Sequence, residues 1–437
     1  MMRSLWSGVA GLKTHQLEMD VIGNNIANVN TTAYKSQATG FSDILYQTVK
    51  AGTGASDNLG STNASQVGFG SKVSSINMNI TKQGSAVLTD NVFDLMITGD
   101  SFFCVSPDVS SGTVNYTRDG SFTIDSDGCL VTQNNGFYVM GVMGDGEITD
   151  GVTVEAPLAL ITDNTKTIAG TATSAAYFSG NIDSEDTNLA EGKALTLEVY
   201  GSDGETYSLK FQLTDGGDTE DNTFTMNLSS IQDSSGNTIA FDSATEMNLV
   251  YDKHTGRIST INDVSTDTVA FTVTGDASVI GPLSIDFSNT SNYAGNAWTH
   301  SSSITGYKGD TEGFNKGYEN GEMSGISITD NGAVYARYTN GQTVKIAHIV
   351  VAEFNNAMGL EKVGDNLYSA SPNSGNPIYM DITSDGGYMS SGVLEGSNVD
   401  LAKEFTDMIT TQRGFQANSR VITTSDEMLQ ILRSLKR

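Results

Sequence analysis

Both ends of this 437-residue chain carry apolar residues at intervals of seven positions. Near the amino end this stripe consists of Leu5, Leu12, Met19 and Ile26, with Val9, Ile22 and Val29 on the same side. Near the carboxyl end it consists of Leu401, Met408, Phe415, Ile422 and Leu429, with Phe405 and Leu432 beside it. Such spacing, with a second apolar set three or four residues away, is typical of helices in coiled-coil-like contact. The sequence therefore predicts an amphipathic helix at each end.

Two interpretations of these helices are open on the pattern alone. In the first, both belong to one ordinary core. In the second, they pair with each other and with copies from other chains. Gly8, Gly11 and Gly23 lower the helix propensity of the first stripe but allow close backbone approach. Polar side chains interrupt both stripes, which disfavours a purely apolar seam inside one chain.

Four asparagines, Asn24, Asn25, Asn28 and Asn30, stand at the end of the first stripe. Asparagine is a mediocre helix former because its amide competes for nearby backbone groups, so these amides are expected to have partners. One hypothesis is that they bond to a neighbouring subunit and set the register of an assembly, since an amide both donates and accepts. The alternative is capping of the helix end within one chain.

The region between the helices has the signals of short strands and tight turns. Residues 50–66 hold almost no large apolar side chain and predict a linker or an extended arm. Apolar alternation with Asp-Gly and Asn-Gly turns marks strands from about 71 to 145 and again from 324 to 354. A Thr-, Ser- and Asp-rich β region lies between them. The simplest nesting makes one domain of the outer β blocks and inserts the middle block into it.

Charge and motif content exclude several classes of function. The formal net charge is -28, and each predicted helical end is close to neutral, so the middle is strongly acidic. This argues against nucleic-acid binding, which depends on Lys and Arg at phosphates. No stretch predicts a membrane span or a conventional cleaved signal peptide. We find no enzyme signature, no metal-ligand spacing and no cofactor motif. Cys104 and Cys129 could form one disulfide, but two small buried side chains are the simpler interpretation.

The terminal motifs resemble those of the flagellar rod and hook axial proteins. The amino-terminal segment "SLWSGVAGLKTHQLEMDVIGNNIANVNTTAYKS" carries that family's "NNIANVNT" run, followed by Ala33, Tyr34 and Lys35. The tail "LEGSNVDLAKEFTDMITTQRGFQANSRVITTSDEML" is similar to the partner signature, and both outer β blocks also resemble the family. In that family a glycine is common at the position of Ala33, and an alanine there slightly narrows the range of allowed backbone conformations.

The resemblance implies a mainly β fold with terminal α-helices, which pair as an antiparallel coiled-coil-like inner domain. The expected domains are 1–30 plus 398–437 as the helical inner domain, 31–70 as linker or arm, 71–148 plus 316–397 as the first β domain, and 149–315 as an outer inserted β domain. The stripe residues named above other than Val9 and Leu432, together with the four asparagines, are expected at subunit interfaces. Burial of the apolar members would supply most of the association free energy.

The resemblance further implies a structural subunit, not an enzyme, that polymerises with itself into a tube. Its length and the middle insertion favour the hook members of the family, which form a curved, flexible joint. The alternatives are a distal rod subunit of the same family and, from another class, a secreted β-rich adhesin. Expected partners are rod proteins, hook–filament junction proteins, the hook cap and the flagellar type III export apparatus. The expected location is the extracellular flagellum, reached without a cleaved signal peptide.

Overall fold

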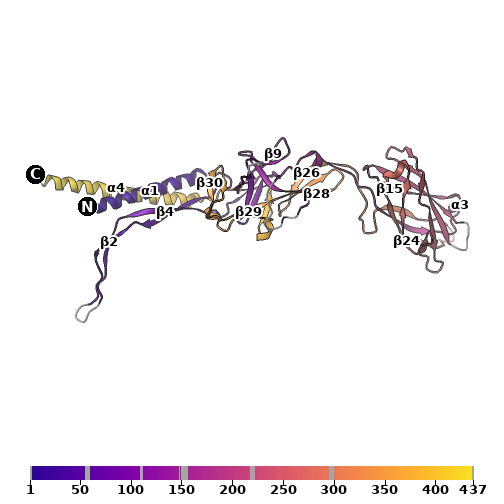
Figure 1. The fold of residues 1–437 in the computed structure, drawn as a ribbon, viewed down its shortest axis with the longest axis horizontal. Helices are drawn as coiled ribbons and strands as arrows, with labels where there is room; N and C mark the ends of the chain where they lie inside the picture. Colours follow the sequence, from indigo (N-terminus) through magenta and orange to yellow (C-terminus); the bar gives the residue numbers. More distant parts are fainter. Residues whose placement is uncertain are drawn as a thin grey trace. The chain divides into compact units, whose positions relative to one another are not determined.

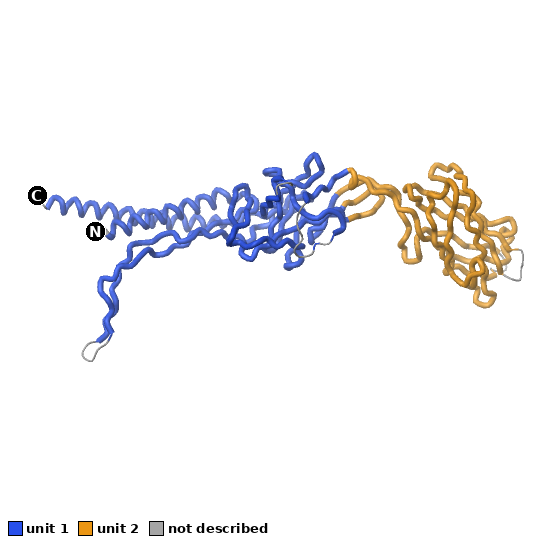
Figure 2. Tube along the Cα trace, viewed as in Figure 1, with its two compact units in different colours: residues 1–162, 326–335, 345–437 blue, residues 163–325, 336–344 orange. Residues whose placement is uncertain are grey.

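The computed structural model describes residues 2–54, 60–108, 112–146, 148, 156–216, 222–294 and 300–435. The chain divides into two compact units (Figure 2). Unit 1 comprises Met1–Thr162, Ile326–Tyr335 and Lys345–Arg437, and unit 2 comprises Asp163–Gly325 and Ala336–Val344. Unit 2 is thus inserted into unit 1, as the predicted nesting requires. The finer division into four domains stays a prediction.

Two long helices form one part of unit 1. Helix α1 spans Met2–Ala27 and helix α4 spans Leu401–Ser434, and they run antiparallel, with the two chain ends at the same end of the pair (Figure 1). The side chain of Asp400 caps α4 by accepting hydrogen bonds from the backbone N–H groups of Ala402 and Lys403. The predicted fold class, mainly β with paired terminal helices, is confirmed.

A two-stranded ribbon follows α1. Strand β1 (Gln37–Asp43) pairs with β4 (Ser71–Met78), and β2 (Tyr46–Lys50) pairs with β3 (Ser65–Gly68), all antiparallel (Figure 1). β1 and β4 pack along α1, where Gly70, at φ +111°, comes so close to Ser7 and Ala10 that a Cβ would lie 3.0 Å from Ala10 Cβ. Of the two alternatives predicted for this region, a linker or an extended arm, the paired ribbon corresponds to the arm.

The β domain of unit 1 is built around β7 (Phe102–Ser106), which pairs with β8, β11 and β29. Its core includes Phe102, Tyr116, Phe354 and Tyr368, whose rings pack edge to face. The other strands are β5 (Ala86–Leu88), β6 (Leu95–Thr98), β8 (Asn115–Thr117), β9 (Phe122–Ile124), β10 (Leu130–Thr132), β11 (Tyr138–Met143), β12 (Ala156–Pro157), β29 (Val351–Glu353), β30 (Glu361–Gly364), β31 (Leu367–Ser369), β32 (Ile378–Met380), β33 (Tyr388–Ser391) and β34 (Val393–Glu395), with 3-10 turns η2 (Ala357–Gly359) and η3 (Ile382–Asp385). The chain passes between the units within β26 (Gly321–Ile328), β27 (Ala333–Tyr338) and β28 (Thr343–Ile349).

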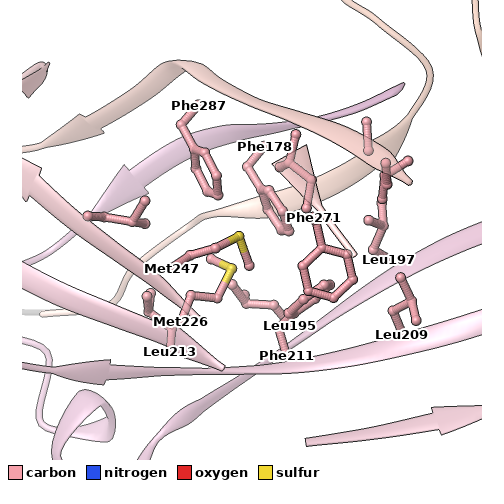
Figure 3. Close-up of a cluster of buried hydrophobic side chains, with 14 of the residues drawn as sticks. Phe178, Leu195, Leu197, Leu209, Phe211, Leu213, Met226, Met247, Phe271 and Phe287 are labelled. Atoms are coloured by element: carbon pink, nitrogen blue, oxygen red, sulfur yellow. The ribbon is translucent and has the colours of Figure 1, made fainter. Parts of the chain in front are cut away.

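Unit 2 consists mainly of two β-sheets around a separate apolar core. One sheet has the order β22-β24-β14-β25 and the other β15-β16-β17-β20-β21. Along β15 and β16 the buried and more exposed residues alternate, so Leu197, Leu209 and Phe211 point into the core beside Phe178 and Phe271 (Figure 3). The elements are α2 (Asp163–Lys166), β13 (Thr167–Ile168), β14 (Ala175–Ile182), α3 (Asn188–Glu191), β15 (Lys193–Tyr200), β16 (Thr206–Asp215), β17 (Thr223–Gln232), β18 (Thr238–Ile239), β19 (Ser243–Ala244), β20 (Met247–Tyr251), β21 (Ile258–Ile261), β22 (Thr268–Phe271), β23 (Val273–Thr274), η1 (Asp276–Val279), β24 (Leu283–Asn292) and β25 (Thr305–Lys308).

Both cysteines are free thiols: Cys104 is buried and Cys129 is partly exposed. The interpretation of two buried side chains thus holds for Cys104 only. Among the described helices, none is long and apolar enough to cross a membrane.

Candidate assembly site at the paired terminal helices

The two terminal motifs meet at a buried ion pair. Lys35 Nζ lies 2.8 Å from Glu395 Oε1, and each side chain is 1% exposed. Lys35 also donates to the carbonyl of Lys82, and the backbone N–H of Gly84 donates to Glu395 Oε1. Burial lowers the pKa of Lys35, and the charge of Glu395 opposes that shift. Because removing one partner would leave the other charge buried and unpaired, this pair fixes how the motifs dock.

Backbone contacts beside the ion pair hold the same two motifs together. The N–H of Ala33 donates to the carbonyl of Glu395 at 2.8 Å, and the N–H of Ser36 donates to Asn398 Oδ1 at 2.7 Å. Asn398 in turn donates to the carbonyls of Asn79 and Lys82. Ala33 has φ +54°, the left-handed region that favours glycine. The structure thus explains why a glycine is expected at this position.

Three of the four asparagines find hydrogen-bond partners inside the chain. Asn24 donates to the hydroxyl of Tyr34, and Asn28 donates back to the carbonyl and side chain of Asn24. Asn25 is 1% exposed and bridges three segments: it donates to the carbonyl of Gln37 and to Glu404 Oε1, and it accepts from the N–H of Gln37. For Asn25 the hypothesis of a partner in a neighbouring subunit is therefore replaced by the intrachain alternative.

Asn30 and Val29 lie just beyond the last turn of α1. Asn30 is exposed, and within the described residues its side chain makes no hydrogen bond. Asn24 is exposed as well, but its amide already donates to the hydroxyl of Tyr34. An interface role for Asn30 stays a prediction.

The seam between α1 and α4 is lined by small and polar residues. A Cβ at Gly8 would lie 3.2 Å from Ile422 Cγ1, and one at Gly11 would lie 2.5 Å from Asn418 Nδ2. A Cβ at Gly414 would lie 2.7 Å from His15 Nε2. The buried residues of α4 are Glu404, Thr411 and Ser425, which lie seven and then fourteen positions apart. The glycines thus allow the close approach expected of them, and the seam is not the apolar stripe.

Most of the predicted apolar stripe is left partly or fully open. Ile22, 5% exposed, is its one buried member among the described residues. Leu5, Leu12, Met19, Ile26, Val29, Met408, Phe415 and Ile422 are half-buried, and Leu401, Phe405 and Leu429 are exposed. Further exposed side chains on these helices, which the seven-residue spacing did not single out, are Trp6, Ile409, Val421, Met428, Ile431 and Leu435. Their signal is simple abundance of apolar residues around the whole circumference of each helix, which indicates burial against more than one neighbour.

Comparison with known proteins decides the family. The chain is 33% identical to the flagellar hook protein FlgE of Borreliella burgdorferi over 100% of both chains, and 33% identical to that of Treponema pallidum, again over 100% of both. The chain belongs to the flagellar hook and rod protein family. It is also 29% identical to the flagellar basal-body rod protein FlgG of Bacillus subtilis over 100% of both chains.

Three family descriptions match separate parts of this hook and rod family chain. They are "Flagella basal body rod protein" at residues 5–35, "Flagellar hook protein FlgE/F/G D1 domain" at 96–170 and "Flagellar basal body rod FlgEFG protein C-terminal" at 390–435. The crystal structure of Helicobacter pylori flagellar hook protein FlgE2 is similar over 71% of this chain and 100% of that one, with a TM-score of 0.45 and 15% identity.

The first and last of these matches coincide with the geometry above. They contain both α1 and α4 almost entirely, together with Lys35, Glu395 and Asn398. The function that follows is structural, as a subunit of the bacterial flagellar hook. Within the described residues no group of three or more His, Cys, Asp or Glu side chains is placed to hold a metal ion.

Proposed function

We propose that this chain polymerises into a curved, flexible tube that transmits torque from the rod to the filament. The observation that carries the proposal is the pairing of α1 with α4 through a small-residue seam, which leaves the apolar side chains of both helices open. Trp6 is 63% exposed and Phe405 is 50% exposed, which a monomeric helix pair in water would not favour. Sister molecules that cover these side chains would stabilise an assembly by burying them.

The two ends of such a tube must bind other proteins. We propose that rod proteins bind one end, that hook–filament junction proteins bind the other, and that a cap binds the growing end during assembly. We further propose export by the flagellar type III apparatus without a cleaved signal peptide, to an extracellular location. The support is the family membership.

A distal rod subunit of the same family is the second candidate. It is favoured by the 29% identity to the Bacillus subtilis FlgG protein over the full length of both chains. Against it stands the higher identity to two hook proteins. The adhesin alternative does not account for the family match of both terminal helices.

Electron microscopy of the purified full chain tests the proposal. We expect curved tubes from the complete chain and none from a variant that lacks residues 1–30 and 398–437. Straight, rigid tubes would favour the rod subunit instead. A complete chain that stays monomeric at high concentration, or a truncated chain that still forms tubes, would overturn the proposal.

A further inference from the structure

An apolar groove lies on the side of α1 that faces away from α4. Trp6, Val9, Ala10 and Lys13 of α1 line it, together with Ile44 and Phe69 at the base of the ribbon, and its volume is about 430 Å³. At about 100° per residue, positions 6, 9, 10 and 13 fall opposite positions 8, 11 and 15, which face α4. No part of α4 of the same chain can therefore fill this groove. Trp6 and Ile44 remain 63% and 41% exposed there.

The carboxyl end of α4 extends beyond its partner. Gly8 lies against Ile422, Gly11 against Asn418, and Asn25 bonds to Glu404, so each step forward in α1 corresponds to one step back in α4. Continued to the start of α1, this register places Met2 level with about residue 428. Residues 428–435, which we call the overhang, then project by about 10 Å at 1.5 Å per residue.

The overhang is apolar and uncovered. All of its residues are exposed, and five of them are large and apolar: Met428 (46%), Leu429 (37%), Ile431 (59%), Leu432 (48%) and Leu435 (76%). At about 100° per residue these five positions fall within an arc of roughly 160°, and the polar residues Gln430, Arg433 and Ser434 occupy the opposite side. The overhang therefore has one broad apolar face, which is typical of a helix that packs against another surface.

We propose that the overhang of one copy docks into the groove of a second copy. This inference rests on the proposed function and deepens it by assigning one subunit contact to named residues. The groove supplies apolar walls from two elements, α1 and the ribbon, which suits a helix with one broad apolar face. Lys13 is exposed at the groove and the overhang itself carries the basic side chain of Arg433, so the contact is apolar rather than one of complementary charge.

The geometry of this contact gives an open assembly. Each copy presents one groove and one overhang, at different surfaces of the same helix pair. Such a head-to-tail contact is heterologous, and a heterologous contact that does not close a ring generates a filament. The ribbon takes part because Ile44 and Phe69 form one wall of the groove, and this gives a function to apolar side chains that the isolated ribbon leaves in water.

Photo-crosslinking in the assembled full-length chain tests the docking directly. A photoreactive phenylalanine derivative replaces Trp6, and this chain is copolymerised with an isotope-labelled copy so that intermolecular products can be recognised by mass. We expect cross-links from position 6 to residues 428–435 of the other copy. The same group at Phe405, which is exposed on α4 far from the overhang, is the control and should link to other peptides. Polymers in which position 6 links to the ribbon, to α1 or elsewhere would overturn the inference while the proposed function stands.

A double-mutant cycle gives an independent test that tolerates weaker assembly. We expect Trp6→Ala and Leu432→Ala each to raise the critical concentration for polymerisation about tenfold or more. Because both remove the same contact, the double variant should exceed the worse single variant by no more than about threefold. Trp6→Ala combined with Phe405→Ala should instead multiply the two effects. Multiplicative effects in both pairs would overturn the docking, and a wild-type chain that forms no polymer at all would overturn the proposed function with it.

Discussion

Asn25 connects distant parts of the sequence, since its hydrogen bond to Glu404 joins residues 379 positions apart. The bond also offsets part of the cost of burying a carboxylate: burial raises the pKa of Glu404, and the hydrogen bond from Asn25 lowers it. The same amide fixes the start of β1 against α1, because it bonds to both the backbone N–H and the carbonyl of Gln37. Its role is thus inside the subunit, before any assembly.

We predict that Asn25→Ala destabilises the isolated subunit by about 1–3 kcal/mol, because it leaves the buried backbone of Gln37 and the carboxylate of Glu404 without a partner. Chemical unfolding of unpolymerised protein measures this. Asn30→Ala, at an exposed position, is the matched control and should change the stability by less than about 0.5 kcal/mol. Equal effects of the two substitutions would contradict the intrachain role.

Asp186 gives unit 2 a dependence on pH. Burial would raise the pKa of this carboxyl, but hydrogen bonds from the backbone N–H groups of Ser302 and Asn188, and from the Asn188 amide, hold it well below its ordinary value. A carboxyl whose pKa is lower in the folded than in the unfolded state stabilises the fold above about pH 4, and this contribution is lost as the pH falls further.

We therefore predict that Asp186→Asn lowers the melting temperature of unit 2 at pH 7 by roughly 5 °C or more, and that this difference shrinks as the pH falls below about 4. Thermal unfolding monitored at a series of pH values measures the difference. Asp163→Asn, at a side chain that is 98% exposed, is the control. A difference that stays constant from pH 7 to pH 2.5 would show that the charge of Asp186 does not stabilise unit 2.

Helices α1 and α4 pack against each other with few large apolar side chains between them. If apolar side chains filled the seam inside the subunit, they would not be available for contacts between subunits. Gly8, Gly11 and Gly414 instead bring the two backbones together with little apolar surface. The inner side of α4 is occupied by polar residues at multiples of seven positions, Glu404, Thr411 and Ser425. The heptad pattern of apolar residues thus faces outward or sideways while a second heptad, made of small and polar residues, faces inward.

We predict opposite effects of alanine at two glycines of α1. Gly23→Ala should stabilise the subunit by about 1 kcal/mol, since helix propensity improves and no atom lies within 4 Å of the new methyl group. Gly11→Ala should give no gain or a loss, because its methyl group would lie 2.5 Å from Asn418 Nδ2 and would displace that side chain. Unfolding by urea measures both. A comparable gain at both positions would show that the seam is not tightly packed.

The sequence predicted the elements better than their contacts. Seven-residue spacing was enough for both helices, and Asp-Gly and Asn-Gly turns were enough for a β-rich middle. The sequence did not predict the strands of the ribbon, because all residues of β2 (Tyr46–Lys50) and β3 (Ser65–Gly68) are exposed. These segments therefore lack the alternation of apolar and polar residues that marks a half-buried strand. The buried ion pair between Lys35 and Glu395 was not predicted, because no local sequence pattern links two residues that are 360 positions apart.

The whole molecule contains separate cores, one in each unit. The core of unit 2 lies within residues 176–304, and a core of unit 1 is formed by residues such as Phe102, Tyr368 and Phe354. No residue belongs to both clusters. Damage to one core is therefore expected to leave the other unit folded, although β26, β27 and β28 each contribute residues to both units.

We predict that Phe211→Ala destabilises unit 2 by about 3–5 kcal/mol and leaves unit 1 unchanged. Phe211 is fully buried, and its ring lies 6.0 Å from Phe178 and 5.4 Å from Phe271 (Figure 3). Calorimetry of the full chain should show one of two transitions shifted to lower temperature. Phe314→Ala, at a ring that is 68% exposed in the same unit, should shift neither. A single transition that moves as a whole would show that the units unfold together.

The ion pair between Lys35 and Glu395 has a consequence for the time course of biosynthesis. A ribosome delivers Lys35 early and Glu395 only when more than nine-tenths of the polypeptide has been translated. Throughout that interval the carboxyl-terminal motif that pairs with the nascent amino-terminal motif has not been synthesised. Helix α1 therefore cannot make its contacts with α4 during most of translation. A message truncated before codon 395 yields a product in which Lys35 has no ion-pair partner at a position that is buried in the complete chain. Such a product is a substrate for proteolysis rather than for assembly.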